Sequence, residues 1–172
     1  MGMDVYGIAP SNEKGNYFRN NVWWWRPLWD YCQDVAPSYT QGINGHTNDG
    51  DGIKDSALAR EFGHHLILTL SNGTAREYIE QRNKTISELP MEECGICNST
   101  GIRTDEIGRE GGQDTKVLSD DLASVYGRTH GWCNGCDGAG EKLPWATNYP
   151  LTEENIREFA EFVIESGGFE IC

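Results

Sequence analysis

The sequence predicts an α+β fold that is mainly helical, with short strands at both ends of the chain and one insertion of a different kind. Three observations support this expectation. Apolar residues recur at helical spacing in two parts of the chain, both ends carry short runs typical of strands, and the helical periodicity stops between residues 91 and 145. We expect residues 1–90 and 146–172 to form a single domain with a helical core and paired terminal strands, and residues 91–145 to form an insertion.

The two ends of the chain predict strands, and an aromatic segment follows the first. The stretch MDVYGI (residues 3–8) predicts the first strand, and FEIC (residues 169–172) predicts the last, which we expect to pair with it. Residues 17–32 are rich in aromatic side chains. Because proline breaks a helix in its interior but not in its first turn, we expect a turn or short helix up to Trp25 and a second short helix from Pro27.

Tryptophans in this segment are expected mainly in the core, since large aromatic side chains contribute much of the burial in a domain. Three of them are adjacent in sequence and cannot all face the same way. At least one should therefore lie at the rim of the core, where it offers a surface for a partner or a ligand. The tryptophans are Trp23, Trp24, Trp25 and Trp29.

Apolar periodicity predicts two of the longer helices with clear N-caps. Residues 56–70 carry an apolar residue at every fourth position, with Asp51 or Asp55 as the cap. Residues 151–168 follow the amphipathic template most closely, with Thr152 as the cap.

A third helix is expected over residues 74–89. Thr74 is the expected N-cap, Glu77 completes a capping box, and Pro90 ends the helix.

Four of the six cysteines form two C-x-x-C pairs inside the segment that lacks helical periodicity. Two residues between cysteines let both thiolates face one ion from a tight turn, and two such turns complete a tetrahedral shell for Zn²⁺. We call the turns knuckle 1 (residues 94–101) and knuckle 2 (residues 133–140). Bound zinc contributes folding free energy, which a segment this poor in apolar side chains requires. The predicted ligands are Cys94, Cys97, Cys133 and Cys136.

Glycines accompany both cysteine pairs. Gly95 and Gly135 lie inside the pairs, where they let backbone amides approach the sulfurs. Gly101 and Gly140 each lie four residues after the second cysteine, where the chain needs a positive φ to leave the knuckle.

Other roles for the cysteines fit less well. A redox dithiol would require a C-x-x-C that opens an apolar helix, and neither pair does so. Scattered buried thiols would not repeat the same spacing. A closed shell of four thiolates leaves no position for water, so catalysis by this zinc is not expected. Cys32 and Cys172 follow apolar residues and are expected to be buried thiols.

The two knuckles resemble the C-x-x-C-x-G-x-G repeat of the DnaJ-type chaperone zinc domain. The second matches at all four positions, whereas the first has Ser99 where a glycine belongs. The resemblance covers two repeats, while that chaperone domain has four repeats and two zinc ions, and the J-domain triplet His-Pro-Asp is absent here. It implies a zinc-ribbon-like pair of knuckles on β-hairpins and does not imply co-chaperone activity.

The whole chain also resembles a group of bacterial and phage proteins to which no activity is assigned. The similar stretches are MDVYG, FRNNVWWWRPLWDY, GWCNGCDGAG and NYPLTEENIREFAEFVIESGGFEIC. This resemblance supports the fold prediction and implies no function.

The net charge and the hydropathy of the chain argue against two classes of protein, those that bind nucleic acids generally and those that cross membranes. With 14 Lys and Arg against 27 Asp and Glu, the formal net charge is -13, so general binding to phosphate backbones is not expected. The first residues lack the basic and apolar regions of a signal peptide, and the longest apolar run, LILTL, is too short to cross a bilayer. We expect a cytoplasmic protein that does not associate with membranes.

The polar loop around residues 46–55 allows three interpretations. Its oxygen ligands alternate as in calcium loops, but the leading Asp and the closing Glu are missing. A loop whose aspartate caps the next helix is the simpler interpretation. The third is a functional site for acid–base or metal chemistry, made by His46, Asn48, Asp49 and Asp51.

Together these features predict a zinc-stabilised module that binds another protein. One form of this hypothesis is an acidic phage or bacterial protein that mimics a nucleic-acid backbone and occupies a host protein. Two alternatives stay open. One is an enzyme that uses the His46–Asp51 loop with the tryptophan-rich segment as a pocket wall. The other is a nucleic-acid-binding zinc protein, with a basic stripe formed by Arg103, Arg109, Arg128 and Lys142.

Overall fold

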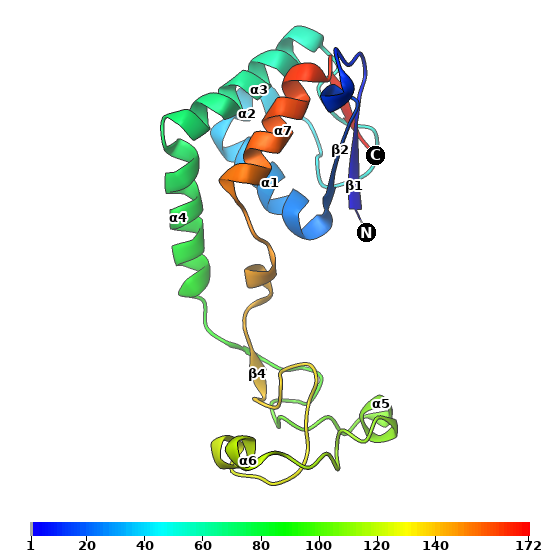
Figure 1. The fold of residues 1–172 in the computed structure, drawn as a ribbon, viewed down its shortest axis with the longest axis vertical. Helices are drawn as coiled ribbons and strands as arrows, with labels where there is room; N and C mark the ends of the chain where they lie inside the picture. The colour runs from blue at the N-terminus through cyan, green and yellow to red at the C-terminus, as the bar shows by residue number, and fades with distance from the viewer. Residues whose placement is uncertain (1) are drawn as a thin grey trace. The chain divides into compact units, whose positions relative to one another are not determined.

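A computed structural model describes residues 2–172 and shows the predicted α+β class. Within this range it contains seven α-helices and five β-strands (Figure 1). The chain divides into two compact units. Unit 1 comprises Met1–Ser87 and Asn148–Cys172, and unit 2 comprises Glu88–Thr147. Within residues 2–172, no helix combines the length and the apolar character needed to cross a lipid bilayer.

Unit 1 contains a three-stranded antiparallel sheet in the order β2-β1-β5. The middle strand β1 (Gly2–Gly7) pairs with β2 (Tyr17–Asn21) and with β5 (Phe169–Ile171), as expected for the two ends of the chain. Val5 of β1 lies opposite Phe18 of β2, and both side chains are buried. The short helix η1 (residues 13–15) connects β1 to β2.

Residues 17–32 differ from the prediction in two respects. The first five form strand β2, and Val22–Val35 form one continuous helix, α1, with Pro27 inside it. The carboxamide of Asn21 caps α1 by accepting two backbone N–H groups, at 3.0 and 3.2 Å. Proline removes only one backbone donor, and the cap together with the buried face of α1 outweighs this loss.

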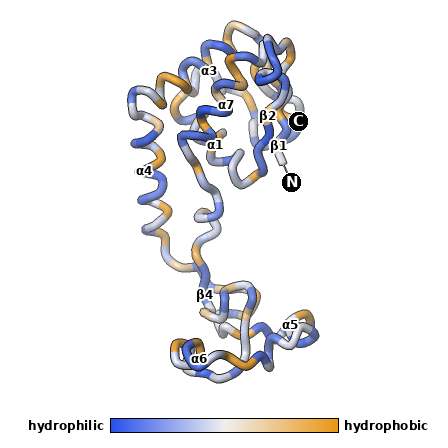
Figure 2. Tube along the Cα trace, in the orientation of Figure 1, coloured by the Kyte–Doolittle hydropathy of each residue, from blue (hydrophilic) through white to orange (hydrophobic). Residues whose placement is uncertain are grey.

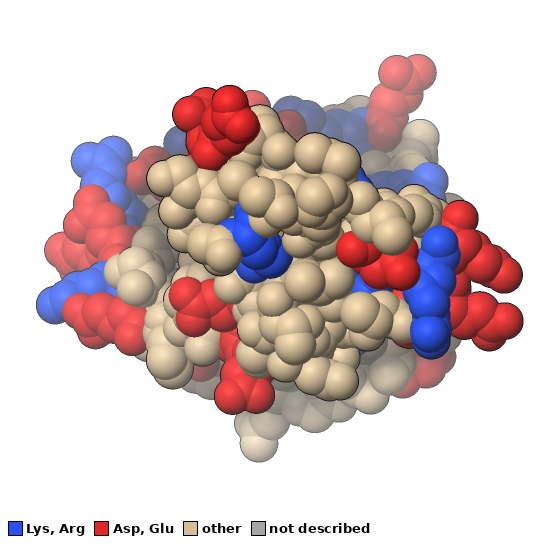
Figure 3. All heavy atoms as spheres, turned by 90° about the horizontal axis from the view of Figure 1, so that it is seen from below, with Lys and Arg blue, Asp and Glu red and all other residues tan. Residues whose placement is uncertain are grey.

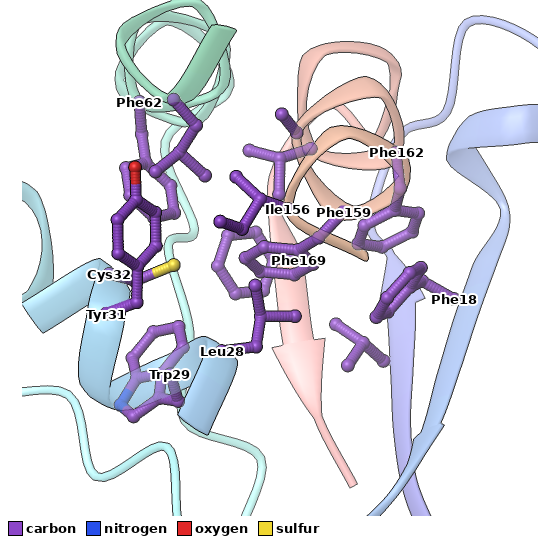
Figure 4. Packing of buried hydrophobic residues seen from close by; sticks show 14 of the residues in the cluster. Phe18, Leu28, Trp29, Tyr31, Cys32, Phe62, Ile156, Phe159, Phe162 and Phe169 are labelled. Atoms are coloured by element: carbon purple, nitrogen blue, oxygen red, sulfur yellow. The ribbon is translucent and has the colours of Figure 1, made fainter. Parts of the chain in front are cut away.

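The core of unit 1 lies between the sheet, α1, α3 (Ser56–Ser71) and α7 (Glu153–Glu165), as Figure 4 shows. Trp25 stacks on Trp29 with ring centroids 5.7 Å apart, and it lies nearly perpendicular to the ring of Phe159, with centroids 5.5 Å apart. Both tryptophans are fully buried, whereas the adjacent two in the sequence, Trp23 and Trp24, are half-buried. The prediction of a tryptophan at the rim is confirmed.

Helices α3 and α7 lie side by side along much of their length (Figure 1). Gly63 of α3 makes this approach possible. A Cβ atom at this position would lie 2.6 Å from Cγ1 of Ile164 and 2.9 Å from the carbonyl oxygen of Ala160. The contact therefore requires a residue without a side chain.

Two of the three predicted caps are confirmed. The Asp55 carboxylate accepts the N–H of Leu58 at 2.7 Å at the start of α3. The hydroxyl of Thr152 accepts the N–H of Asn155 at 3.2 Å at the start of α7.

The cap of α4 (Thr74–Ser87) is not the predicted one. Thr74 is already inside the helix, and its N–H donates to the carboxamide of Asn72 at 3.0 Å. Along α4, polar and apolar residues alternate (Figure 2), yet only Ala75 is fully buried. Unit 1 also contains the short helix α2 (Pro37–Thr40).

Unit 2 contains two short helices that the sequence pattern did not predict. They are α5 (Glu106–Glu110) and α6 (Asp120–Tyr126), which begin at side-chain caps from Asp105 and Ser119. Of their residues only Gly108 is buried. Helices that bury almost nothing have no apolar stripe, so periodicity could not reveal them.

The strands of unit 2 are very short. Glu92–Glu93 (β3) pairs antiparallel with Glu141–Lys142 (β4), and a single bridge joins Val117 to His130. The helix η2 (Trp145–Asn148) follows β4. The structure does not confirm the predicted zinc-ribbon likeness, because the ladder between β3 and β4 is only two residues long.

Candidate metal centre

The four predicted cysteines come together inside unit 2. The Sγ atoms of Cys94 and Cys133 are 3.9 Å apart, and those of Cys97 and Cys136 are 3.7 Å apart. All four sulfurs lie within 4.8 Å of one another, and all four side chains are buried. A tetrahedron of sulfurs around an ion at about 2.3 Å has edges of about 3.8 Å. The observed separations therefore suit a single tetrahedral ion and are too long for disulfides, which need about 2.0 Å.

Both knuckles turn in the same way after the second cysteine. The next two residues adopt a left-handed conformation, and so does the glycine that follows two residues later. In knuckle 1 these residues are Asn98, Ser99 and Gly101, with φ of 49°, 63° and 72°. In knuckle 2 they are Asp137, Gly138 and Gly140, with φ of 49°, 79° and 86°. The predicted positive φ of the two final glycines is confirmed.

Backbone amides point at the sulfurs from the ends of the turns. The N–H of Gly101 donates to Sγ of Cys97 at 3.3 Å, and the N–H of Gly140 donates to Sγ of Cys136 at 3.2 Å. Such bonds favour the charged form of the sulfur, because an N–H dipole stabilises a negative charge. Gly135 also directs its N–H at Cys133, as its position inside the pair predicts.

The pKa values of Cys94, Cys133 and Cys136 shift in different directions. Burial opposes ionisation of Cys94, but the N–H groups of Cys97 and Ile96 and the neighbouring thiols lower its pKa to about 7. Burial and neighbouring sulfurs raise the pKa of Cys136 to about 12, and burial also raises the pKa of Cys133. Negative charges this close repel one another, so the cluster is fully ionised only when a cation joins it.

The two knuckles are in direct contact. The N–H of Cys94 in knuckle 1 donates to the carbonyl of Gly140 in knuckle 2 at 3.0 Å. A Cβ at Gly101 would lie 2.3 Å from the carbonyl oxygen of Gly138, and a Cβ at Gly140 would lie 2.3 Å from that of Ser99. The final glycines are therefore needed for the left-handed turn and also for this close approach.

The polar loop does not gather its predicted residues around one point. Asp49 accepts the Thr47 hydroxyl at 2.5 Å and the N–H of Asp51 at 3.2 Å, and these bonds lower its pKa. Asp51 in turn accepts the N–H of Asn44 at 3.0 Å. Within the part of the chain that the structure describes, only the cysteines gather three or more metal-ligating side chains this closely.

His46 finds a partner that the sequence did not suggest. Its Nε2 lies 3.1 Å from Oδ1 of Asp30 in α1, on the protein surface. A pocket of about 460 Å³ adjoins Trp24 and is lined by side chains of β2, α1 and α7, but neither His46 nor Asp49 lines it. The loop does contact the tryptophan-rich helix, since the Trp25 indole N–H donates to the carbonyl of Gly45 at 2.6 Å, but this pocket does not combine His46, Asp49 and Trp24.

The remaining two cysteines differ from each other. Cys32 is buried as predicted, and burial raises the pKa of its thiol. Cys172 is exposed, so its predicted burial was wrong. The backbone of Cys172 still exchanges hydrogen bonds with Asp4 of β1, at 2.7 and 3.2 Å. Because side chains alternate along a strand, the Cys172 side chain faces away from the core on which Phe169 and Ile171 pack.

Searches of protein families, curated proteins and solved structures found no match to this chain. The proposed function therefore rests on the cysteine cluster and its surroundings.

Proposed function

We propose that the four cysteines bind one Zn²⁺ and that this ion orders unit 2. The separation of the sulfurs, 3.7 and 3.9 Å between partners in opposite knuckles, is the observation that supports this most directly. Four thiolates in a tetrahedron select zinc or iron, and the shell has no open position for a substrate. The ion's role is therefore structural. The likeness of the knuckles to the DnaJ-type repeat supports the choice of zinc.

The composition of the interior of unit 2 explains why an ion is needed. Its buried hydrophobic residues are the four cysteines and Leu118. By contrast, the core of unit 1 is a cluster of large aromatic and aliphatic side chains. A thiol cluster without an ion cannot replace such a core, whereas metal binding supplies on the order of 10 kcal/mol in small zinc domains.

Metal content and cobalt substitution test this proposal. We expect the purified protein to contain one zinc per chain by plasma emission spectrometry. Cobalt in its place should show the intense sulfur-to-metal charge transfer and the visible bands of a tetrahedral thiolate site. The variant Cys133→Ser should lose stoichiometric metal, whereas the matched control Cys172→Ser, which alters an exposed thiol, should retain it. A metal-free wild-type protein with an ordered unit 2 would refute the proposal.

We further propose that the zinc-stabilised protein is an interaction module whose partner is another protein. Unit 2 exposes several apolar side chains that its own interior does not use, on α5, α6 and the neighbouring loops. They are Ile107, Val117, Val125 and Leu143, between 64 and 73% exposed. Figure 3 shows a largely uncharged face with acidic and basic side chains around it, and acidic groups predominate in the chain, whose formal net charge is -13. A partner with apolar anchors and a basic rim fits these features.

Affinity capture followed by quantitative binding tests the interaction. A partner identified by capture should bind the purified protein directly. Its affinity should fall on substituting Val125→Glu and on raising NaCl from about 0.05 M to about 0.5 M. As a matched control, Ser124→Glu adds the same charge at the neighbouring exposed position of α6. Equal effects of the two substitutions, or binding indifferent to salt, would count against this partner chemistry.

The nucleic-acid alternative receives little support from the basic residues it requires. Arg103 donates to Asp105 at 2.8 Å, and Lys142 lies 5.8 Å from the ring centroid of Trp145. Arg128 is bonded inside unit 2. Unit 2 carries eleven acidic side chains and five basic ones, so its potential repels phosphate.

A further inference from the structure

Arg128 lies between the two knuckles and bonds to both. Its Nη2 donates to the carbonyl oxygen of Gly101 in knuckle 1 at 3.0 Å and to that of Gly138 in knuckle 2 at 2.6 Å. A guanidinium nitrogen carries two hydrogens in a fixed plane, so one nitrogen can serve both carbonyls. The two halves of the candidate metal centre are therefore joined by a side chain as well as by the backbone.

Comparison of equivalent positions in the two knuckles shows which hydrogen bond the Arg128 side chain replaces. Cys94 corresponds to Cys133, and Gly140 corresponds to Gly101. On one side the N–H of Cys94 donates to the carbonyl of Gly140 at 3.0 Å. On the other side the equivalent carbonyl, that of Gly101, accepts from Arg128 instead. The arginine takes the place of a second backbone bond between the knuckles.

The glycines of the repeat make room for the guanidinium. A Cβ at Gly101 would lie 2.6 Å from Nη2 of Arg128, and a Cβ at Gly138 would lie 3.3 Å from the same atom. Both glycines also have positive φ. These positions therefore serve the turn and the arginine together.

Helix α6 positions the Arg128 side chain between the two knuckles. The helix ends at Tyr126, and Gly127 reverses the chain with φ of 65°. The guanidinium carbon of Arg128 lies 4.9 Å from the ring centroid of Tyr126, whose hydroxyl donates to the carbonyl of Asp137 at 3.0 Å. Because α6 buries none of its own residues, its contribution to unit 2 is this placement. The Nε of Arg128 is buried without a partner among the described residues, a cost that the two carbonyl bonds offset.

We propose that Arg128 is a positioning residue for the metal, which joins the two knuckles before the ion binds and holds the four sulfurs within coordinating distance. This inference rests on the proposed metal site. A site that is already assembled loses less conformational entropy on binding, so its affinity for the ion is higher. The arginine acts through the carbonyls of the knuckles and is not itself a ligand.

Metal affinities of three variants of the 172-residue chain test the inference. Zinc or cobalt affinity is measured by competition with a chelator. Arg128→Met keeps the apolar length and removes the donors, and we expect the affinity to fall about 10- to 100-fold, as for other residues that orient metal ligands. Arg128→Lys keeps the charge but lacks the planar pair of donors, so its affinity should lie between those of wild type and Arg128→Met. Arg109→Met, an exposed arginine of unit 2, is the matched control and should bind like wild type.

A second measurement distinguishes two explanations for a lower metal affinity. One is loss of the link between the knuckles, and the other is a general effect of the substitution on charge or stability. In the double variant Cys94→Ser, Cys97→Ser, only knuckle 2 can bind cobalt, through two thiolates. Adding Arg128→Met should cause no further loss of affinity there, because no second half remains to be joined.

Several results would overturn the inference. They are wild-type affinity in Arg128→Met, full recovery in Arg128→Lys, an equal loss in Arg109→Met, and the same loss in the single-knuckle background as in the complete site. If the wild-type chain bound no metal at all, the proposed metal site would fail and this inference with it. Normal metal binding by wild type and by Arg128→Met would overturn the role of Arg128 alone.

Discussion

Ser99 and Gly138 occupy equivalent positions in the two knuckles, and both have a left-handed backbone, with φ of 63° and 79°. A left-handed conformation costs a residue with a Cβ about 1–2 kcal/mol, whereas glycine adopts it freely. Ser99 is exposed, so its hydroxyl contributes nothing to the interior that would offset this strain. Knuckle 1 is therefore the more strained half of the centre.

We predict that Ser99→Gly stabilises the metal-loaded protein. Relief of the strain outweighs the extra entropy of glycine in the unfolded chain, and the expected net gain is about 0.5–1 kcal/mol. Urea unfolding followed by a spectroscopic signal of unit 2 measures this. Ser99→Ala, which removes the hydroxyl but keeps the Cβ, should show no such gain.

The reverse substitution in knuckle 2 should be harmful. A Cβ at Gly138 would lie 2.9 Å from the ring of Trp132, in addition to the strain of its positive φ. We expect Gly138→Ala to destabilise unit 2 by more than Ser99→Gly stabilises it. Equal stability of Gly138→Ala and wild type would show that the turn is not constrained in this way.

Removal of the metal should affect the two units differently. With a strong chelator, amide resonances of Glu88–Thr147 should lose their dispersion, because this unit has almost no apolar core. Resonances of unit 1 should persist, since its core contains no cysteine of the cluster. Two-dimensional amide spectra before and after chelation, with zinc added back, test this. Retained dispersion throughout unit 2 would contradict it.

Gly63 should be essential to the contact between α3 and α7. In Gly63→Ala the new methyl group would meet Cγ1 of Ile164 at 2.6 Å, so the helices must separate. Overpacking of this kind costs about 1–3 kcal/mol, and it overrides the better helix propensity of alanine. Thermal unfolding monitored by circular dichroism measures the loss. His64→Ala, at the adjacent exposed position of α3, is the control and should change stability by less than about 0.5 kcal/mol.

Tyr31 should make unit 1 sensitive to alkali. Its hydroxyl is buried and donates to Thr69 at 2.6 Å, and burial raises its pKa from 10.0 to about 12. Between pH 10 and pH 12 the unfolded chain releases a proton that the folded chain retains. The stabilisation that comes from the neutral phenol is therefore complete below pH 10 and declines as the pH rises, by up to about 1.4 kcal/mol per pH unit.

To test this, the free energies of unfolding of wild type and Tyr31→Phe are measured with urea between pH 9 and pH 11. The difference in stability between them should shrink as the pH rises, because phenylalanine has no proton to release. A constant difference across this range would show that Tyr31 does not titrate as the structure implies.

Features that depend on a few neighbouring residues were predicted well. The caps at Asp55 and Thr152 need only a side-chain oxygen and an N–H three residues later. The positive φ of Gly101 and Gly140 follows from the local geometry of a turn around a sulfur. The two C-x-x-C pairs were also recognisable, because the two-residue spacing between their cysteines is read directly from the sequence.

Several features that depend on distant contacts were missed, although the pairing of β1 with β5 was predicted. Strand β2 exists because it pairs with β1, and of its five residues only Tyr17 and Phe18 favour strands, a signal too short to predict it. Helix α1 continues through Pro27 because a buried face of large side chains compensates for one missing hydrogen bond. The role of Arg128 depends on two carbonyls, one 27 and the other 10 residues away in sequence, and no spacing pattern marks such a contact.

The amino-acid sequence was sufficient to predict the α+β class, the helices α3, α4 and α7, and the identity of the four clustered cysteines. Each of these depends on periodicity, caps or spacing, which act over a few residues. The three-dimensional structure was needed to show that the predicted ligands bring their sulfurs within 4.8 Å of one another, that Arg128 joins the knuckles and that His46 meets Asp30 rather than Asp49. These outcomes are set by packing and pairing between segments far apart in the chain, whose combined free energy exceeds any local preference.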